Sequence, residues 1–130
     1  MPRASGMTGA ERDEPQRFRR SDRLKKRYEF RQVQLNGRRI HTAHFLIVVQ
    51  PNASPTTRLG ITVTKKVGSA VQRNRIKRVV REVFRRNRGL FPPNHDVVFI
   101  AKRGSDDIDY ESLLKELRGA ARKLRPKEAR

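Results

Sequence analysis

The sequence predicts an α/β protein in which helices pack on a small sheet, and three observations support this fold class. Residues 72–88 carry apolar side chains at the spacing of one helical face. Residues 43–50 are rich in β-branched residues, and residues 58–64 alternate between apolar and polar or small positions, as strands do. The predicted order is helix, strand, strand, helix, strand, helix, which favours a two-layer α/β (α+β) sandwich.

The composition indicates a protein that meets a polyanion. The chain has 130 residues, with 32 Lys and Arg against 13 Asp and Glu, a net charge of +19 and a pI near 11.7. Such an excess is typical of proteins that meet nucleic acid or an anionic membrane. No window approaches the roughly 20 apolar residues of a membrane-spanning helix. The absence of Cys fits a cytoplasmic location, which we expect for this chain.

The chain divides into one domain with two polar ends. Residues 1–20 have little apolar periodicity and several charges, which predicts a disordered basic N-terminal arm, starting at Met1 or at Met7. Residues 21–125 are expected to form a single domain, and residues 126–130 a polar tail. Within the domain, the first helical pattern runs through Phe30 and Val33, and Gly37 follows at a position suited to a left-handed helix end.

The remaining elements follow from periodicity and turn signals. The strands at 43–50 and 58–64 are predicted to pair antiparallel across the loop at 51–57. The apolar run at 97–101 is typical of a strand buried on both faces. Residues 110–124 repeat a helical apolar stripe, and Asp109 is the expected N-cap.

The central helix carries an unusual charge pattern. Between Arg73 and Arg88 there are eight basic residues and one acid, Glu82. On a helical wheel the apolar stripe lies on one side, and the cations gather on the other. Like charges at helical spacing repel, so a polyanionic partner that neutralises them is the simplest explanation.

The order of motifs resembles the protein subunit of bacterial ribonuclease P. The signature is carried by Lys-Lys-Val-Gly-Ser-Ala-Val at 65–71, followed by Arg-Asn-Arg-Ile-Lys-Arg at 73–78. Arg-Leu-Lys-Lys at 23–26 with Phe30, Val33 and Gly37 matches upstream, and the strand at 98–101 with a helix near Tyr110 matches downstream. The resemblance covers about residues 20–125.

This resemblance implies a four-stranded sheet, three helices and a left-handed βαβ crossover through the basic helix. It implies a protein that binds a catalytic RNA and the 5′ leader of precursor tRNA, and assists RNA-catalysed removal of that leader. The expected partners are therefore the catalytic ribonuclease P RNA and precursor tRNA, without a membrane or an obligate protein partner. Mg²⁺ is expected to be held mainly by the RNA, with no metal bound tightly by the protein.

Two groups of site residues follow from the spacing and the resemblance. Arginine suits phosphate because its planar fork can bind two oxygens. The expected RNA-binding residues are Lys65, Lys66, Arg73, Asn74, Arg75, Lys77, Arg78, Arg81 and Arg85. The expected leader cleft is lined by Phe30, Val48, Arg73 and Arg81.

Several of these positions have a second interpretation. Phe30 fits both core packing and a cleft wall where a base stacks. Asn74 could be an ordinary residue near a helix start, and Lys65 and Lys66 could merely solubilise a loop. Gln34 and Val48 stand where some relatives carry aromatic residues, which predicts a leader contact that depends less on stacking.

The sequence predicts no catalytic side chain. His41, His44 and His95 have no neighbouring Cys or carboxylate cluster in sequence, which argues against a zinc site. Three other functions remain open at this stage: an RNA-scaffolding protein of similar fold, a metal-dependent nuclease, and a membrane-surface helix.

Overall fold

The computed structural model describes residues 23, 24 and 26–124. The predicted N-terminal arm, Lys25 and the predicted tail lie outside the described residues. The elements are, in chain order, α2 (Arg27–Asn36), β1 (Arg38–His41), β2 (Phe45–Pro51), β3 (Arg58–Thr62), α3 (Ala70–Arg86), a 3-10 turn (Arg88–Leu90), β4 (His95–Ala101), α4 (Tyr110–Gly119) and α5 (Ala121–Leu124).

The four strands form one mixed sheet in the order β1-β2-β4-β3. β4 pairs antiparallel with β2 and parallel with β3, and α3 connects the two parallel strands. The predicted antiparallel pairing of 43–50 with 58–64 is therefore wrong, because β4 lies between those strands. The mixed four-stranded sheet with helices confirms the α+β class, while the left-handed sense of the crossover stays a prediction.

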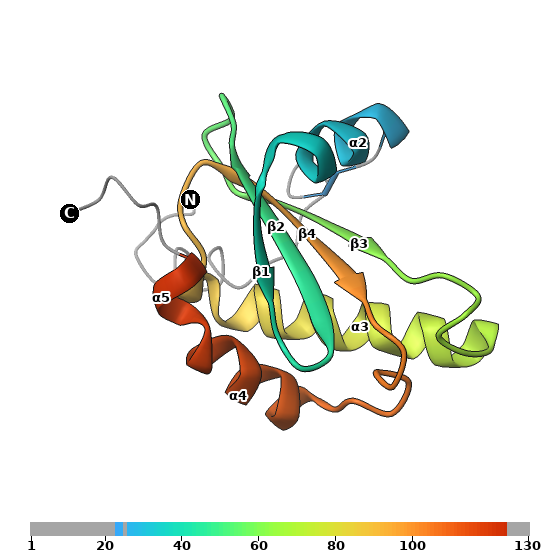
Figure 1. Cartoon of the computed structure of the whole chain (residues 1–130). Helices are drawn as coiled ribbons and strands as arrows, with labels where there is room; N and C mark the ends of the chain where they lie inside the picture. Colours follow the sequence, from blue (N-terminus) through green and yellow to red (C-terminus); the bar gives the residue numbers. More distant parts are fainter. Residues whose placement is uncertain (1–22, 25, 125–130) are drawn as a thin grey trace, which may run out of the picture.

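Helices cover both faces of this sheet (Figure 1). The larger core lies between the sheet and α3 with α4, and it includes Ile47, Phe99, Ile76 and Leu117. A smaller cluster on the other face packs Val33 of α2 against Val48 and Val98. The two-layer description thus fits the main core, and α2 adds a partial third layer.

The helix α3 begins earlier than its apolar stripe because Ser69 caps it. The Ser69 hydroxyl accepts a hydrogen bond from the backbone N of Gln72 at 3.2 Å, and the Gln72 side chain accepts one from the backbone N of Ser69 at 2.8 Å. This reciprocal pair is a capping box. At the other end, the Asn87 side chain donates to the carbonyl oxygen of Val83 at 2.9 Å, which satisfies one of the last free acceptors.

Two local predictions have opposite outcomes. Asp109 is the N-cap of α4, since its carboxylate accepts a hydrogen bond from the backbone N of Ser112 at 2.9 Å. Gly37 is not left-handed: its φ of −81° and ψ of 164° are extended. A glycine is needed here because there is no room for a side chain: a Cβ would lie 2.6 Å from Val48 Cγ1 and 2.7 Å from the Val33 carbonyl oxygen.

Within the described residues, no helix has the length and apolar character needed to span a membrane.

Candidate nucleic-acid interface

The helix α3 is two-sided, as its sequence predicts. Ile76, Val80, Val83 and Phe84 are at most 1% exposed and face the main core. Arg78 and Asn74 are exposed, whereas Lys77 and Arg81 are half-buried. Packing of the apolar side against the core fixes the orientation of the helix, and this also fixes the direction in which its polar side faces.

Lys77 and Arg81 line a groove that runs between α2 and α3 with β3 as its floor. The groove consists of two adjoining hollows of about 290 and 540 Å³. Phe30, Ile61 and Lys77 line both hollows. We call these two hollows together the α2–α3 groove. The other lining residues are Arg23, Leu24, Leu59, Gly60 and Arg81 in the first hollow, and Arg27, Arg31, Gln34, Thr62 and Val63 in the second.

The α2–α3 groove is strongly cationic. Five of its lining residues are Lys or Arg, and none of them is Asp or Glu. Burial, and then the nearby positive charge of Arg23, lowers the pKa of Arg81 from its ordinary value. Arginine stays charged at any physiological pH, so an anion bound in the groove would lower the repulsion between these cations.

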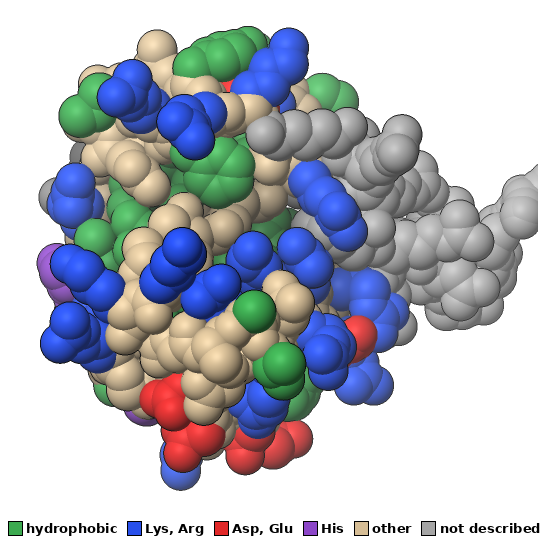
Figure 2. Space-filling view, turned by 90° about the vertical axis from the view of Figure 1, so that its right-hand side faces the viewer, with side chains coloured by type: hydrophobic (Ala, Val, Ile, Leu, Met, Phe, Trp, Pro, Cys, Tyr) green, Lys and Arg blue, Asp and Glu red, His purple; other side chains and the backbone are tan. Residues whose placement is uncertain are grey.

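Figure 2 shows the end of the molecule where α3 begins, and Lys and Arg side chains are spread over much of this face. Most of the acidic surface visible there lies at its lower edge. An extended polyanion could therefore cross this face without meeting a carboxylate along most of its path.

Phe30 combines its two possible roles. It packs against the small cluster under α2 and also lines both hollows. It lies directly over β3, because a Cβ at Gly60 would be only 2.6 Å from Phe30 Cε1. The ring is thus fixed against the strand while part of it faces the groove.

Two residues expected in the leader cleft do not line this groove. Val48 is 0% exposed and belongs to the cluster under α2, so its assignment to a cleft surface is wrong. Val33 of α2 and Val98 of β4 belong to the same cluster and cover Val48. Arg73 donates instead to the carbonyl oxygen of Gly68 at 2.9 Å, at the start of α3, and is absent from the lining of both hollows.

The other expected RNA-binding residues lie around the start and the outer sides of α3. Lys65 and Lys66 are exposed in the turn that leads into α3, next to the buried Val67. Arg75 is half-buried on the side of α4, where its charge helps to lower the pKa of Asp109. Arg85 is paired with Glu82, and this hydrogen bond raises the pKa of Arg85. Arg85 is therefore already partly neutralised.

The structure adds groove residues that the sequence reading missed. These are Arg27 and Arg31 of α2, which line the second hollow together with Phe30 and with Gln34, a position that the sequence had already linked to the leader contact. Their spacing of i, i+3, i+4 and i+7 places them on one helical face. The sequence contains this spacing, but three of the four residues are polar, so a search for apolar stripes does not find it.

Two of the three histidines, His44 and His95, have structural partners. The ring of His44 pairs with the carboxylate of Glu116 on α4, and His95 is buried with Nδ1 2.8 Å from the carbonyl oxygen of Pro93. In the described part of the chain, no group of three or more His, Cys, Asp or Glu side chains could hold a metal ion. The expectation that the protein binds no metal tightly stays a prediction.

These features define a class: a small α+β protein that presents a basic helix and a cationic groove to a polyanion. The comparisons with known proteins agree with this class. The family model of ribonuclease P matches residues 18–125. The ribonuclease P protein component of Syntrophus aciditrophicus is 46% identical over 100 residues, which cover 77% of this chain and 84% of that protein. The corresponding protein of Desulfosudis oleivorans is 48% identical over 103 residues, covering 77% and 85% of the two chains.

Solved structures show the same fold. The ribonuclease P protein of Thermotoga maritima matches with a TM-score of 0.70 at 31% identity, over 78% of this chain and 96% of that one. The protein of Staphylococcus aureus matches with a TM-score of 0.71 at 29% identity, over 78% and 94%. The chain therefore belongs to the ribonuclease P protein family, the protein components of a tRNA-processing endoribonuclease.

Proposed function

We propose that this chain binds the catalytic RNA of ribonuclease P through α3 and the turn before it, and binds the 5′ leader of precursor tRNA in the α2–α3 groove. The RNA performs the cleavage and holds the Mg²⁺, and the protein contributes affinity for the substrate. Its place of action is then the cytoplasm, where the catalytic RNA and precursor tRNA meet.

The single observation that carries this proposal is the groove itself, which joins cations to an aromatic ring. Lys77 and Arg81 can neutralise phosphates, and Phe30 offers an apolar surface beside them. Single-stranded nucleic acid is bound by this combination, because the charges follow the backbone and aromatic rings accept bases of any sequence.

The geometry also favours an accessory role over catalysis by the protein. The groove presents donors and an aromatic surface but no carboxylate or His among its lining residues. Such a lining can position a phosphodiester and stabilise its charge, but it offers no general base to activate water.

Reconstitution at low Mg²⁺ tests the proposal. The protein is added to the catalytic RNA encoded by the same genome, and cleavage of a precursor tRNA is followed at an Mg²⁺ concentration where the RNA alone is slow. We expect the protein to restore cleavage at the mature 5′ end, because its cations lower the charge repulsion that Mg²⁺ otherwise screens.

Three controls separate the alternatives. Protein without RNA should leave the precursor intact, and cleavage there would identify a nuclease in its own right. Failure to restore cleavage would favour another RNA-scaffolding role. Binding to anionic vesicles that exceeds binding to the catalytic RNA would favour a membrane-surface protein.

A further inference from the structure

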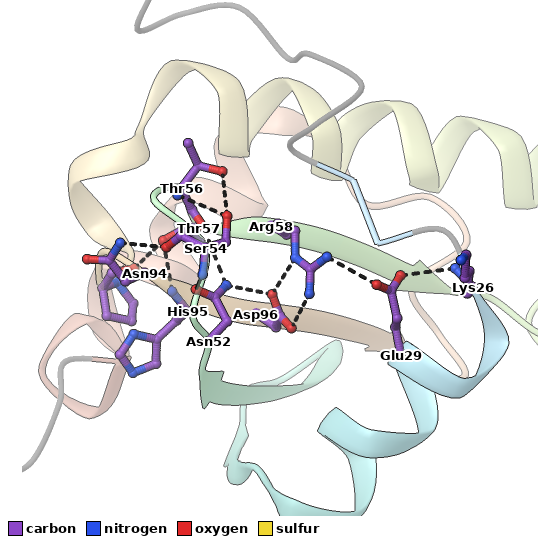
Figure 3. Close-up of polar contacts among 11 residues, drawn as sticks. Lys26, Glu29, Asn52, Ser54, Thr56, Thr57, Arg58, Asn94, His95 and Asp96 are labelled. Atoms are coloured by element: carbon purple, nitrogen blue, oxygen red, sulfur yellow. Dashed lines mark hydrogen bonds and ion pairs between the residues drawn. The ribbon is translucent and has the colours of Figure 1, made fainter.

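Arg58 joins three elements on the α2 side of the sheet (Figure 3). From β3 it donates through Nε to Asp96 Oδ1 and through Nη2 to Asp96 Oδ2, each at 2.9 Å. Its third nitrogen, Nη1, donates to Glu29 Oε2 of α2 at 3.1 Å. The guanidinium therefore uses all of its forked geometry on two carboxylates.

Both ends of this chain of contacts are fixed. Asp96 of β4 is 7% exposed and also accepts a hydrogen bond from the Asn52 side chain at 2.7 Å. Glu29 accepts a second hydrogen bond, from the backbone N of Lys26 at the start of α2, at 3.1 Å. The side chains of Arg58, Glu29 and Asp96 are 26%, 21% and 10% exposed, so water screens the pairs only partly.

This chain of contacts anchors the part of α2 that forms the groove wall. Phe30 follows Glu29 directly, and it rests on Gly60, two residues after Arg58 on the same strand. The rest of α2 is held elsewhere, since Val33 packs on Val48 and Val98 over β2 and β4. The position of Phe30 relative to Lys77 and Arg81 thus depends on the contacts that β3 makes with the first half of α2.

We propose that Arg58 is a positioning residue, which through Glu29 holds Phe30 at the distance from α3 that single-stranded RNA requires. This inference rests on the proposed function, in which the leader lies in the α2–α3 groove. Neither Arg58 nor Glu29 needs to touch the leader, because their effect is transmitted through the placement of α2.

For Glu29, positioning and simple electrostatics predict opposite changes in leader affinity. Replacing Glu29 by Gln removes a negative charge and frees Arg58 Nη1 from its carboxylate, so electrostatics alone predicts tighter binding of any RNA. Positioning predicts the opposite for the leader, since α2 loses the charged contact that fixes Phe30. The two explanations are separated by the direction of the change.

The test compares affinities of the reconstituted RNA–protein complex for two precursor tRNAs. One has a leader of several nucleotides, and the other a leader of a single nucleotide. The Kd for the short-leader precursor divided by the Kd for the long-leader precursor measures the leader contribution. We expect Glu29→Gln to reduce this ratio about threefold to tenfold, as partial loss of one stacked base would. Arg58→Lys should act in the same direction, because an ammonium lacks the planar fork that binds Asp96 through two nitrogens and Glu29 through a third.

Matched controls exclude effects of charge and folding. Glu111→Gln makes the same charge change on α4, on the other side of the sheet, and should leave the ratio unchanged. Thermal unfolding and the Kd of the protein for the catalytic RNA are measured for each variant. In a Phe30→Ala background, Glu29→Gln should have no further effect on the ratio, because the residue it positions is gone.

The outcomes are distinct. An unchanged or larger ratio in folded Glu29→Gln protein overturns the positioning role while the proposed function stands. If Glu29→Gln lowers the ratio by the same factor in the Phe30→Ala background as in wild type, the positioning role is also overturned, because Glu29 would then act independently of Phe30. A wild-type ratio of one rejects the leader contact in the proposed function, and the positioning role with it.

Discussion

Gly37 and Gly60 show how a missing side chain shapes the site. A Cβ at Gly37 would crowd Val48 and two backbone oxygens, and a Cβ at Gly60 would meet the ring of Phe30. Neither glycine has a left-handed backbone, since the positive φ of a described glycine occurs at Gly104. The sequence predicted a left-handed helix end at Gly37 and a strand position at Gly60, and it could not show the side chains and backbone atoms of other elements that lie against these glycines.

Asp109 offers a prediction on pH dependence at the scale of one residue. The hydrogen bond from the backbone of Ser112 lowers the pKa of Asp109 from its ordinary value of 3.8. The folded state therefore holds this proton less tightly than the unfolded state does. Its stabilisation is present above the unfolded pKa and is lost as the pH falls through the folded pKa.

Replacing Asp109 by Ala should accordingly lower the Tm at pH 7, and the difference from wild type should shrink below about pH 4. Thermal unfolding followed by circular dichroism at several pH values measures this. Asp107→Ala, an exposed position in the same loop, makes the same charge change without removing a cap. An equal Tm loss in both variants at every pH would contradict the capping role.

At the scale of elements, α3 is the part of the fold that the sequence predicts best. Its apolar stripe repeats from Ile76 to Phe84, and a helix is the conformation that gathers those positions on one face. The periodicity located β2, β3 and β4, but it missed the short strand β1 and gave the wrong partners to β2 and β3. A period of two shows which face of a strand is buried, and says nothing about which strand lies beside it.

Two Val to Asp substitutions on α3 test its two-sidedness. Val80 is 1% exposed and Val71 is 79% exposed on the same helix. We expect Val80→Asp to destabilise the fold by more than about 4 kcal/mol, because it buries an unpaired charge. Val71→Asp is the matched control and should unfold almost as wild type does.

Circular dichroism and chemical unfolding measure both variants. Similar stability of the two would mean that the assignment of the core-facing and outward sides of α3 is wrong. The result concerns the fold alone and is independent of any RNA.

At the scale of the whole molecule, the α2–α3 groove arises from elements far apart in the chain. Phe30 and Lys77 line the same hollows, although the three strands β1, β2 and β3 lie between them in the chain. Sequence spacing can group residues within a helix, but the meeting of two helices across a strand needs the sheet order. This is why Lys77 and Arg81 were predicted on the strength of α3, while Arg23, Arg27 and Arg31 were missed and Val48 was misplaced.

The net charge of +19 also belongs to this scale. Acidic residues are not excluded from the fold, but several of them are used inside it: Glu29 and Asp96 bind Arg58, and Glu116 pairs with His44. Arg27 and Arg31 beside the groove and Arg78 on α3 are exposed. The distribution of charge, as well as its sum, favours a polyanion on that face.

The salt dependence of binding to the catalytic RNA tests the central claim, which is that an apolar side fixes α3 while its cationic side binds phosphates. If about five or six phosphates are neutralised, the slope of log affinity against log salt should be steeper than about −3. Arg78→Ala should reduce its magnitude by roughly one, whereas Arg122→Ala on α5 should leave it unchanged. A flat slope, or equal slopes for wild type and Arg78→Ala, would contradict the account.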